Sequence, residues 1–264
     1  MISVSSDMLQ AWVSGLLWPL TRILAVIAAA PLFSHRAMPN MVKLGFGLVL
    51  TLIIMPTMPV VPKVDIVSMA GLLILIQQVV IGAAIGFSMH VMFAAAELAG
   101  QLGSMTMGLG FASFFDPQTQ GQSTSVSQFF GLLAMLVFLS MNGHLLLISA
   151  IGDSFTSLPI SAQATTYING MTMAAWGGKI FSAGLLMSLP VVAALLVTNM
   201  ALGILTRTAP QLNLFGIGFP ITIGLGFLII ALSLPGMLQP IQRLIGESFS
   251  FVAGLGLPPI PGRP

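Results

Sequence analysis

The 264-residue sequence contains no cysteine, which excludes disulfides, thiolate metal ligands and a cysteine nucleophile. Charge is almost as scarce, because Asp, Glu, Lys and Arg together make up only 5% of the residues. Soluble globular proteins carry about a quarter charged residues, so this chain lacks the polar coat of a water-facing surface. The eight basic residues form no run, so a nucleic-acid-binding face is not expected.

Recognisable catalytic motifs are missing as well. The sequence contains no Walker A loop, HExxH, GxSxG or complete GxGxxG. The three histidines lie far apart in the chain, which is not the spacing of metal ligands. We therefore expect no enzyme activity, metal or cofactor. Asp7 and the absence of a basic stretch near the N-terminus also argue against a cleaved signal peptide.

Apolar residues make up most of what is present, 56% of the chain, with a mean hydropathy of +1.04. Six stretches approach or exceed the roughly 20 residues that cross a bilayer as a helix: 9–33, 41–62, 66–96, 126–151, 171–201 and 212–238. Helices are expected because lipid satisfies no free backbone N–H or C=O, and the alternation of barrel strands is absent. The sequence predicts an all-α, multi-helix membrane protein with one domain, residues 1–264.

Prolines and small residues predict how these helices pack. Prolines interrupt or border several stretches: Pro19, Pro31, Pro56, Pro190, Pro220 and Pro235. Such residues predict kinked or broken helices whose freed backbone groups are satisfied by protein neighbours. Small residues recur at every fourth position in two series: Gly82 and Gly86, then Ala96, Gly100, Ser104 and Gly108. Their close helix contacts are either internal to the chain or made with another subunit.

A plug-like segment covers about residues 105–125. It combines glycine, aromatic and turn-forming residues: Gly108, Gly110, Phe111, Phe114, Phe115, Asp116 and Pro117. Glycines permit unusual backbone conformations, Asp-Pro favours a turn, and residues 118–125 form an uncharged polar tether. One interpretation is a movable apolar plug that shuts a pore. The other is an ordinary re-entrant turn whose phenylalanines fill a core.

Charged residues within apolar stretches form a second group of candidates. Arg22 lies in the middle of the first stretch, where an unpaired charge is costly. It could pair with a carboxylate such as Glu97, meet the carbonyls of a broken helix, or line an aqueous path. His90 and Glu97 are seven residues apart and therefore share a helix face. A structural or interface role is favoured for them over a proton relay.

Several longer segments together resemble the FliR family, the R-type integral membrane subunits of the flagellar type III protein export gate. The resemblance rests on these segments: Ala30–Pro39, Lys43–Gly47 running to Pro56, Gln77–Gly82, Met107–Pro117, Asn142–His144 and Arg207–Pro220. They follow the family's order along nearly the whole chain. The same segments give a weaker resemblance to the equivalent subunit of virulence type III secretion systems, although the Phe-x-Asp-Pro and Asn-Gly-His elements look flagellar.

This resemblance implies a structural, pore-forming subunit in the bacterial inner membrane and the flagellar basal body. The implied partners are P- and Q-type gate subunits, the B-type specificity switch protein, membrane lipid and unfolded flagellar export substrates, but no nucleic acid. The family's plug maps onto residues 108–122, with the three phenylalanines closing the conduit, Gly108 and Gly110 as the hinge and Asp116-Pro117 shaping the turn. The segment from Arg207 to Pro220 would contact another subunit.

One alternative function and one segment remain open. The broken helices also suit a small-molecule secondary transporter, but the two halves of the sequence show no convincing internal repeat. The C-terminal segment 239–264 is mildly amphipathic and rich in proline, and the sequence assigns it no role.

Overall fold

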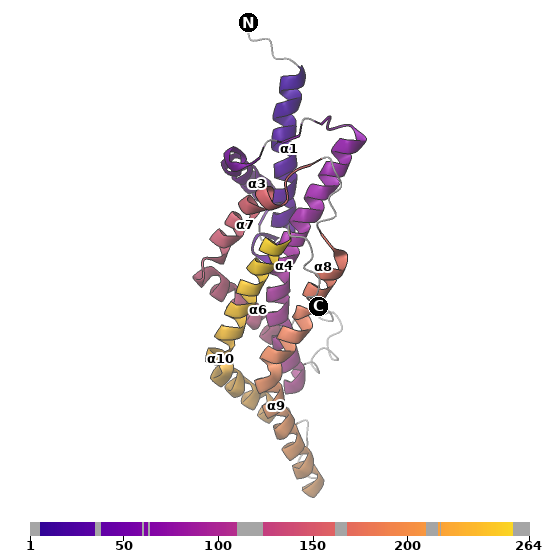
Figure 1. Cartoon of the computed structure of the whole chain (residues 1–264). Coiled ribbons are helices and arrows are strands. Elements are labelled where there is room, and N and C mark those ends of the chain that lie inside the picture. Colours follow the sequence, from indigo (N-terminus) through magenta and orange to yellow (C-terminus); the bar gives the residue numbers. More distant parts are fainter. Residues whose placement is uncertain are drawn as a thin grey trace. The chain divides into compact units, whose positions relative to one another are not determined.

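A computed structural model describes residues 6–34, 38–59, 61–62, 64–109, 124–161, 168–209, 216 and 218–255, with side chains from Trp12 onward. The regular elements within these ranges are helices (Figure 1), so the predicted all-α fold is confirmed for this part of the chain. Their bounds are α1 (Ser6–Ala29), α2 (Pro31–Ser34), α3 (Asn40–Ile54), the 3-10 helix η1 (Met55–Thr57), α4 (Met69–Met107), α6 (Ser125–Ser140), α7 (Gly143–Ser157), α8 (Gly170–Gly177), α9 (Lys179–Thr208) and α10 (Phe219–Gly254).

Within the described residues, five helical spans are long and apolar enough to cross a membrane. They are residues 12–29, 40–57, 69–107, 170–208 and 219–254. The pair α6 and α7 passes the same test together but bends by 70°, as a broken span or a re-entrant hairpin does. At this bend Asn142 adopts a left-handed backbone with φ of 56°, which asparagine tolerates better than most residues. These elements correspond to the six predicted stretches.

Four of the predicted stretches end before their helices do, and the difference is largest at α4 and α10. Helix α4 continues to Met107 rather than residue 96, because Glu97 is accommodated at the surface while Ala99 and Ser104 are buried by neighbouring helices. Helix α10 continues to Gly254 through two prolines, so the beginning of the predicted segment 239–264 prolongs the last span. Residues 256–264 of that segment lie outside the described residues.

The chain forms two compact units, each built from separate stretches of sequence. The first contains residues 1–91, 142–177 and 246–264, and the second contains residues 92–141 and 178–245. Helices α4 and α10 therefore each contribute to both units. The prediction of a single domain stays a prediction, because compact units made of interleaved segments are not by themselves independent domains.

In the first unit, α1 packs closely on α3 and α4. A Cβ added to Gly82 of α4 would clash with the backbone oxygen of Arg22, and one added to Gly86 would clash with Ala29 of α1. On the other side of α1, a Cβ at Gly47 of α3 would lie 2.7 Å from Leu24 Cδ2. These glycines allow helix backbones to approach one another, which favours association within a membrane.

The second unit repeats this arrangement around the C-terminal half of α4. A Cβ at Gly100 would lie 2.7 Å from Ser127 Cα of α6, and one at Gly184 of α9 would lie 2.9 Å from Leu98 Cδ2. Phe93 and Phe138 meet edge to face, with ring centroids 5.6 Å apart. The internal-packing interpretation of the small-residue series is therefore confirmed at Gly100, as it is at the two glycines of the first unit.

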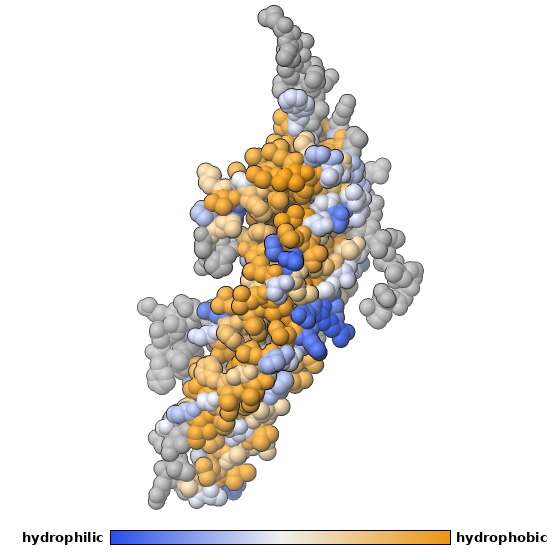
Figure 2. Space-filling model, turned by 90° about the vertical axis from the view of Figure 1, so that its left-hand side faces the viewer, coloured by the Kyte–Doolittle hydropathy of each residue, from blue (hydrophilic) through white to orange (hydrophobic). Residues whose placement is uncertain are grey.

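Large apolar side chains also lie on the outside of the described helices. Figure 2 shows a face on which hydrophobic residues predominate. Examples in the second unit are Leu132, Leu186 and Met200, which are exposed to 65%, 62% and 69%. Such surfaces need lipid or another protein as their neighbour. The chain is thus an integral membrane protein that leaves many large apolar side chains uncovered by its own packing.

Candidate functional site

The plug-like segment falls mostly outside the described residues. Residues 110–123, here called the α4–α6 connector, include six of the seven predicted plug residues: Gly110, Phe111, Phe114, Phe115, Asp116 and Pro117. Their roles in closure stay predictions. Gly108 is described, and so are the two helix ends that hold the connector, which makes its attachment open to physical argument.

Gly108 begins the departure of the chain from α4. Its φ of +85° lies in the left-handed region, and its N–H donates to the Met105 carbonyl oxygen at 3.1 Å. A Cβ here would lie 2.6 Å from Cε1 and 2.7 Å from Cδ1 of the Phe219 ring. Glycine is therefore required for two reasons, the backbone conformation and the space that the aromatic ring occupies.

The first turns of α10 hold the end of α4 in place. Thr222 Oγ1 donates a 3.1 Å hydrogen bond to the backbone oxygen of Met107, one of the carbonyls that a helix end leaves without an intrahelical partner. Met107 itself is fully buried, and a Cβ at Gly226 would lie 2.5 Å from its Cγ. The connector thus starts from a tightly packed base.

The far end of the connector is fixed by a helix cap. Thr124 precedes α6 with an extended backbone, and its Oγ1 accepts a hydrogen bond from the Ser127 N–H at 3.2 Å. The same hydroxyl donates to Gln101 Oε1 of α4, also at 3.2 Å. Such a cap satisfies a free N–H of the first turn. Both ends of the connector are therefore held within the second unit.

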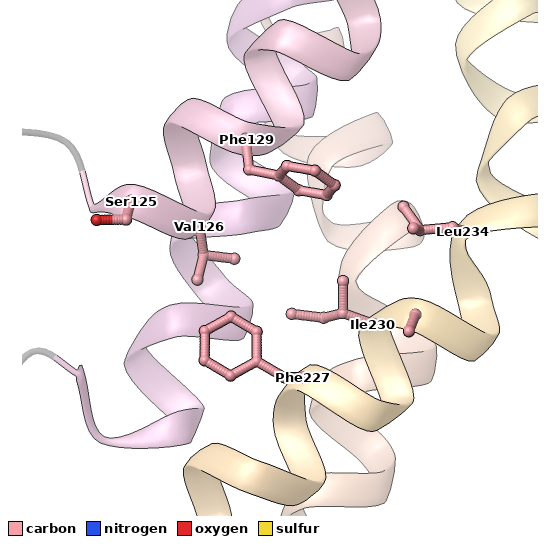
Figure 3. Close-up of a pocket in the computed structure, with 7 residues that line it drawn as sticks. Ser125, Val126, Phe129, Phe227, Ile230 and Leu234 are labelled. Atoms are coloured by element: carbon pink, nitrogen blue, oxygen red, sulfur yellow. The ribbon is translucent and has the colours of Figure 1, made fainter.

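An apolar pocket of about 290 Å³ lies between the first turns of α6 and the middle of α10 (Figure 3). Phe129 of α6 and Phe227 of α10 face the opening, together with Ile230 and Leu234. Ser125, the residue that follows the N-cap of α6, also borders the pocket, but its hydroxyl points away from it (Figure 3). A pocket of this kind suits apolar groups and offers little to orient a polar substrate.

Arg22 is fully buried at a junction of three helices in the first unit. Its Nε donates to Gln78 Oε1 of α4 at 2.8 Å. Its Nη1 donates to the Ser154 backbone oxygen at 2.8 Å and to Ser154 Oγ at 3.1 Å, and its Nη2 donates to the Leu158 oxygen at 2.8 Å. The guanidinium carbon lies 4.2 Å from the centroid of the Phe155 ring.

These contacts make Arg22 a cap for the C-terminal end of α7. A helix C-terminus carries partial negative charge and free carbonyls, so a guanidinium is stabilised there without a carboxylate. Instead of the carboxylate considered from the sequence, the structure shows backbone carbonyls, and these lie at the C-terminal end of α7 rather than at the break between α6 and α7. Gln78 Nε2 is buried without a partner in the described part of the chain, while Gln78 Oε1 accepts from Arg22.

The remaining predicted charged residues lie at the surface and do not form one site. His90 and Glu97 are exposed on α4, the first in one compact unit and the second in the other. Arg207 is exposed in the last turn of α9, where a cation stabilises the helix end. The residues that follow it, 210–215, lie outside the described part of the chain.

Four residues that bind Arg22 or fix the ends of the connector were not identified from the sequence. Gln78 and Ser154 receive Arg22, and Thr124 and Thr222 fix the connector ends. The signal for Gln78 was available, since a polar side chain in a charge-free apolar run requires a partner. The hydroxyl residues gave no signal, because serine and threonine occur throughout these helices and usually bond to their own backbone. Across the described residues, no group of three or more potential ligands could hold a metal.

The fold and the site define a helical membrane protein in which hydrogen bonds fix the two helix ends that flank the α4–α6 connector. Residues 13–248 match the family described as bacterial export proteins, family 1, and the chain belongs to that family. The flagellar biosynthetic protein FliR of Pectobacterium carotovorum subsp. carotovorum is 43% identical over 255 residues, covering 97% of each chain. FliR of Escherichia coli (strain K12) is 38% identical over the same length and share. FliR of Bacillus subtilis (strain 168) is 35% identical over 213 residues, covering 79% of this chain and 82% of that protein.

Proposed function

We propose that this chain forms part of the wall and the closure of a conduit through which unfolded flagellar subunits cross the bacterial inner membrane. The main support is the similarity to flagellar biosynthetic FliR proteins, which extends over 97% of the chain in two relatives. On that similarity the chain is a membrane component of the flagellar type III export apparatus. The same relatives favour the flagellar system over a virulence secretion system.

The connector is the proposed closure. Its residues take the roles given by the resemblance: Phe111, Phe114 and Phe115 fill the conduit, Gly108 and Gly110 form the hinge, and Asp116 and Pro117 shape the turn. The attachment of the connector supports this proposal. Thr222 and Thr124 hold its two ends by hydrogen bonds, so a connector between fixed ends can be displaced and then return. Apolar constrictions shut pores to water and ions while remaining displaceable.

The proposed partners are P- and Q-type gate subunits around the conduit and the B-type specificity switch protein in the basal body. The exposed apolar side chains of α6 and α9 support contacts of this kind. Arg207, at the end of α9, is proposed to belong to a subunit contact. In this arrangement the chain acts as a structural subunit, without an enzymatic step.

A small-molecule transporter is less well supported. Transporters of this size place polar groups at broken helices to bind solute and coupling ions. Arg22, the buried cation described above, is engaged by Gln78 and by the C-terminal end of α7, so it is not free to bind a solute. The pocket between α6 and α10 is lined almost entirely by apolar side chains.

The first test is to tag the chain, express it with its neighbouring membrane proteins, extract the membranes gently and identify what copurifies. A stable complex with P- and Q-like subunits is expected. A stable chain without partners would overturn the proposal and direct attention to solute uptake.

The second test addresses closure in the purified complex. Replacing the three connector phenylalanines with serine is expected to raise ion conductance in a planar bilayer, because the apolar barrier is lost. Phe181→Ser on α9, where the phenylalanine is exposed, serves as the matched control and should leave conductance unchanged. Unchanged conductance in the triple variant would exclude the connector as the closure.

A further inference from the structure

Glu97 occupies an unusual position for one of only six acidic residues in the chain. It is exposed on α4, and its side chain lies across α6, where a Cβ at Gly131 would be 3.0 Å from Oε1 and 3.1 Å from Cγ. Its backbone oxygen accepts a hydrogen bond from Ser127 Oγ of α6 at 2.8 Å. The backbone of Glu97 is therefore fixed against α6, and its side chain lies along the seam between the two helices.

The surface beside this carboxylate is largely apolar, although Gln128, three residues before Gly131 on α6, is exposed on it. Leu132, Leu136 and Leu139 lie on the side of α6 next to Gly131, exposed to 65%, 65% and 39%. Met105, eight residues further along α4 and about 80° around that helix from Glu97, is 62% exposed. We call this surface, formed by Glu97 and these four apolar side chains, the Glu97 seam.

Charge decides what covers the Glu97 seam. Acyl chains would cover the leucines but would leave a carboxylate in an apolar medium, which is strongly unfavourable. An aqueous conduit would solvate the carboxylate but would leave the leucines in water. A protein helix that is apolar apart from one basic side chain satisfies both parts of the surface.

We propose that the Glu97 seam binds an apolar helix of a partner gate subunit, with an Arg or Lys of that helix paired to the Glu97 carboxylate. This inference rests on the proposed function, which supplies the partner subunits. The basic side chain sets the register of the partner helix, because it can pair at one position only. The partner would grip α4 and α6 together, and these are the two helices that hold the ends of the α4–α6 connector.

The first experiment measures the partner subunits retained by the tagged, co-expressed chain after detergent extraction. Glu97→Lys is expected to reduce the retained partner by at least about tenfold, and Glu97→Gln by a smaller factor, because like charges in an apolar contact repel. Asp153→Lys and Asp153→Asn, at an exposed acidic residue of α7, are the matched controls and should change nothing. Normal retention by Glu97→Lys would overturn the proposal.

A second variant moves the carboxylate without removing it. Gly131→Ala places a methyl group against the Glu97 side chain and is expected to reduce retention by several fold. Gly152→Ala on α7 is its control, since nothing lies within 4 Å of a Cβ there. Equal retention by both glycine variants would show that the position of the carboxylate is unimportant and would contradict the proposed pairing.

The decisive experiment combines photocrosslinking with charge reversal in the full complex. A benzophenone side chain at Leu132 is expected to crosslink to a partner subunit, at a helix that contains a basic residue within one turn. Replacing that residue with Glu should restore partner retention to Glu97→Lys, which a misfolded variant could not show. Crosslinks to lipid alone, or to an exported polypeptide, would overturn the proposal. If the unaltered chain forms no complex, the proposed function itself has failed.

Discussion

Replacing Arg22 with methionine tests whether the buried guanidinium holds the first unit together. The guanidinium joins three helices through Gln78 of α4 and through Ser154 and Leu158 at the end of α7. Methionine has a similar length and fits an apolar site, so the substitution removes the hydrogen bonds and the charge while filling most of the volume. The packing of the side chain stem against its neighbours is largely retained.

The expected loss of stability follows from the hydrogen-bond acceptors that the substitution leaves without a donor. The Ser154 backbone oxygen keeps a second donor, the Leu158 N–H at 2.9 Å, so it remains satisfied. Gln78 Oε1 and the Leu158 oxygen lose the donors that Arg22 provides. A hydrogen bond to a charged group contributes about 1.5–3 kcal/mol net of desolvation, so losing two should lower the free energy of unfolding by about 3–6 kcal/mol. This lies in the upper range for a single substitution.

Unfolding of the detergent-solubilised chain by SDS titration, followed by tryptophan fluorescence, measures this loss. Trp18 lies one turn before Arg22 and reports on the same helix. Adding Gln78→Leu to Arg22→Met removes one stranded acceptor and should recover about 1–3 kcal/mol. Thr21→Ala is the control, because Thr21 bonds only to its own helix and should cost less than about 1 kcal/mol. A loss below about 0.5 kcal/mol, or no recovery in the double variant, would refute the reasoning.

Two further predictions concern the connector base and the C-terminal end of α10. Gly108→Ala forces alanine into a left-handed backbone, which costs about 1–2 kcal/mol, and pushes its methyl group against the Phe219 ring. We therefore expect the ion conductance of the complex to rise. Gly224→Ala is the control and should leave the conductance unchanged, because the space around Gly224 is open. Trp176 stacks on Phe251 with ring centroids 4.5 Å apart, so Trp176→Leu should speed maleimide labelling of a cysteine placed at the exposed Ser250. The chain's lack of cysteine gives this measurement no background. Unaltered conductance or labelling would contradict the respective prediction.

Hydropathy predicted the spans well, because a helix that crosses a bilayer must be long and apolar regardless of which helices pack against it. It failed at the ends of α4 and α10. Hydropathy ends a stretch where polar residues begin, as at Glu97, whereas a helix continues while its other faces are buried. Ala99 and Ser104 are buried, and a Cβ at Gly100 would clash with α6, so packing extends α4 past its first charge.

The sequence predicted which residue types form the candidate site, but it did not predict which residues they contact. The glycines before the connector predicted an unusual backbone, and Gly108 adopts one. The ring that fills the space beside it belongs to Phe219, more than a hundred residues later, and no local pattern identifies such a neighbour. Similarly, a charge in the middle of a span predicted a need for partners at Arg22. Its bonds to Ser154 join residues 132 positions apart in the sequence. Because every residue has a backbone carbonyl, the sequence does not indicate which carbonyl accepts the bond.

Arg22 and Glu97 answer the same physical demand in opposite ways. Each is a charge on an apolar helix, where the surroundings must supply a partner. Arg22 finds neutral acceptors within its own chain, so its charge is satisfied as soon as the first unit folds and contributes to the stability of the unassembled subunit. The Glu97 carboxylate is exposed beside leucines, so its surroundings are completed only by another molecule. A chain that kept both charges internally satisfied would be more stable alone and less selective in assembly. The placement of Glu97 therefore favours a subunit that reaches its lowest free energy only within the complex.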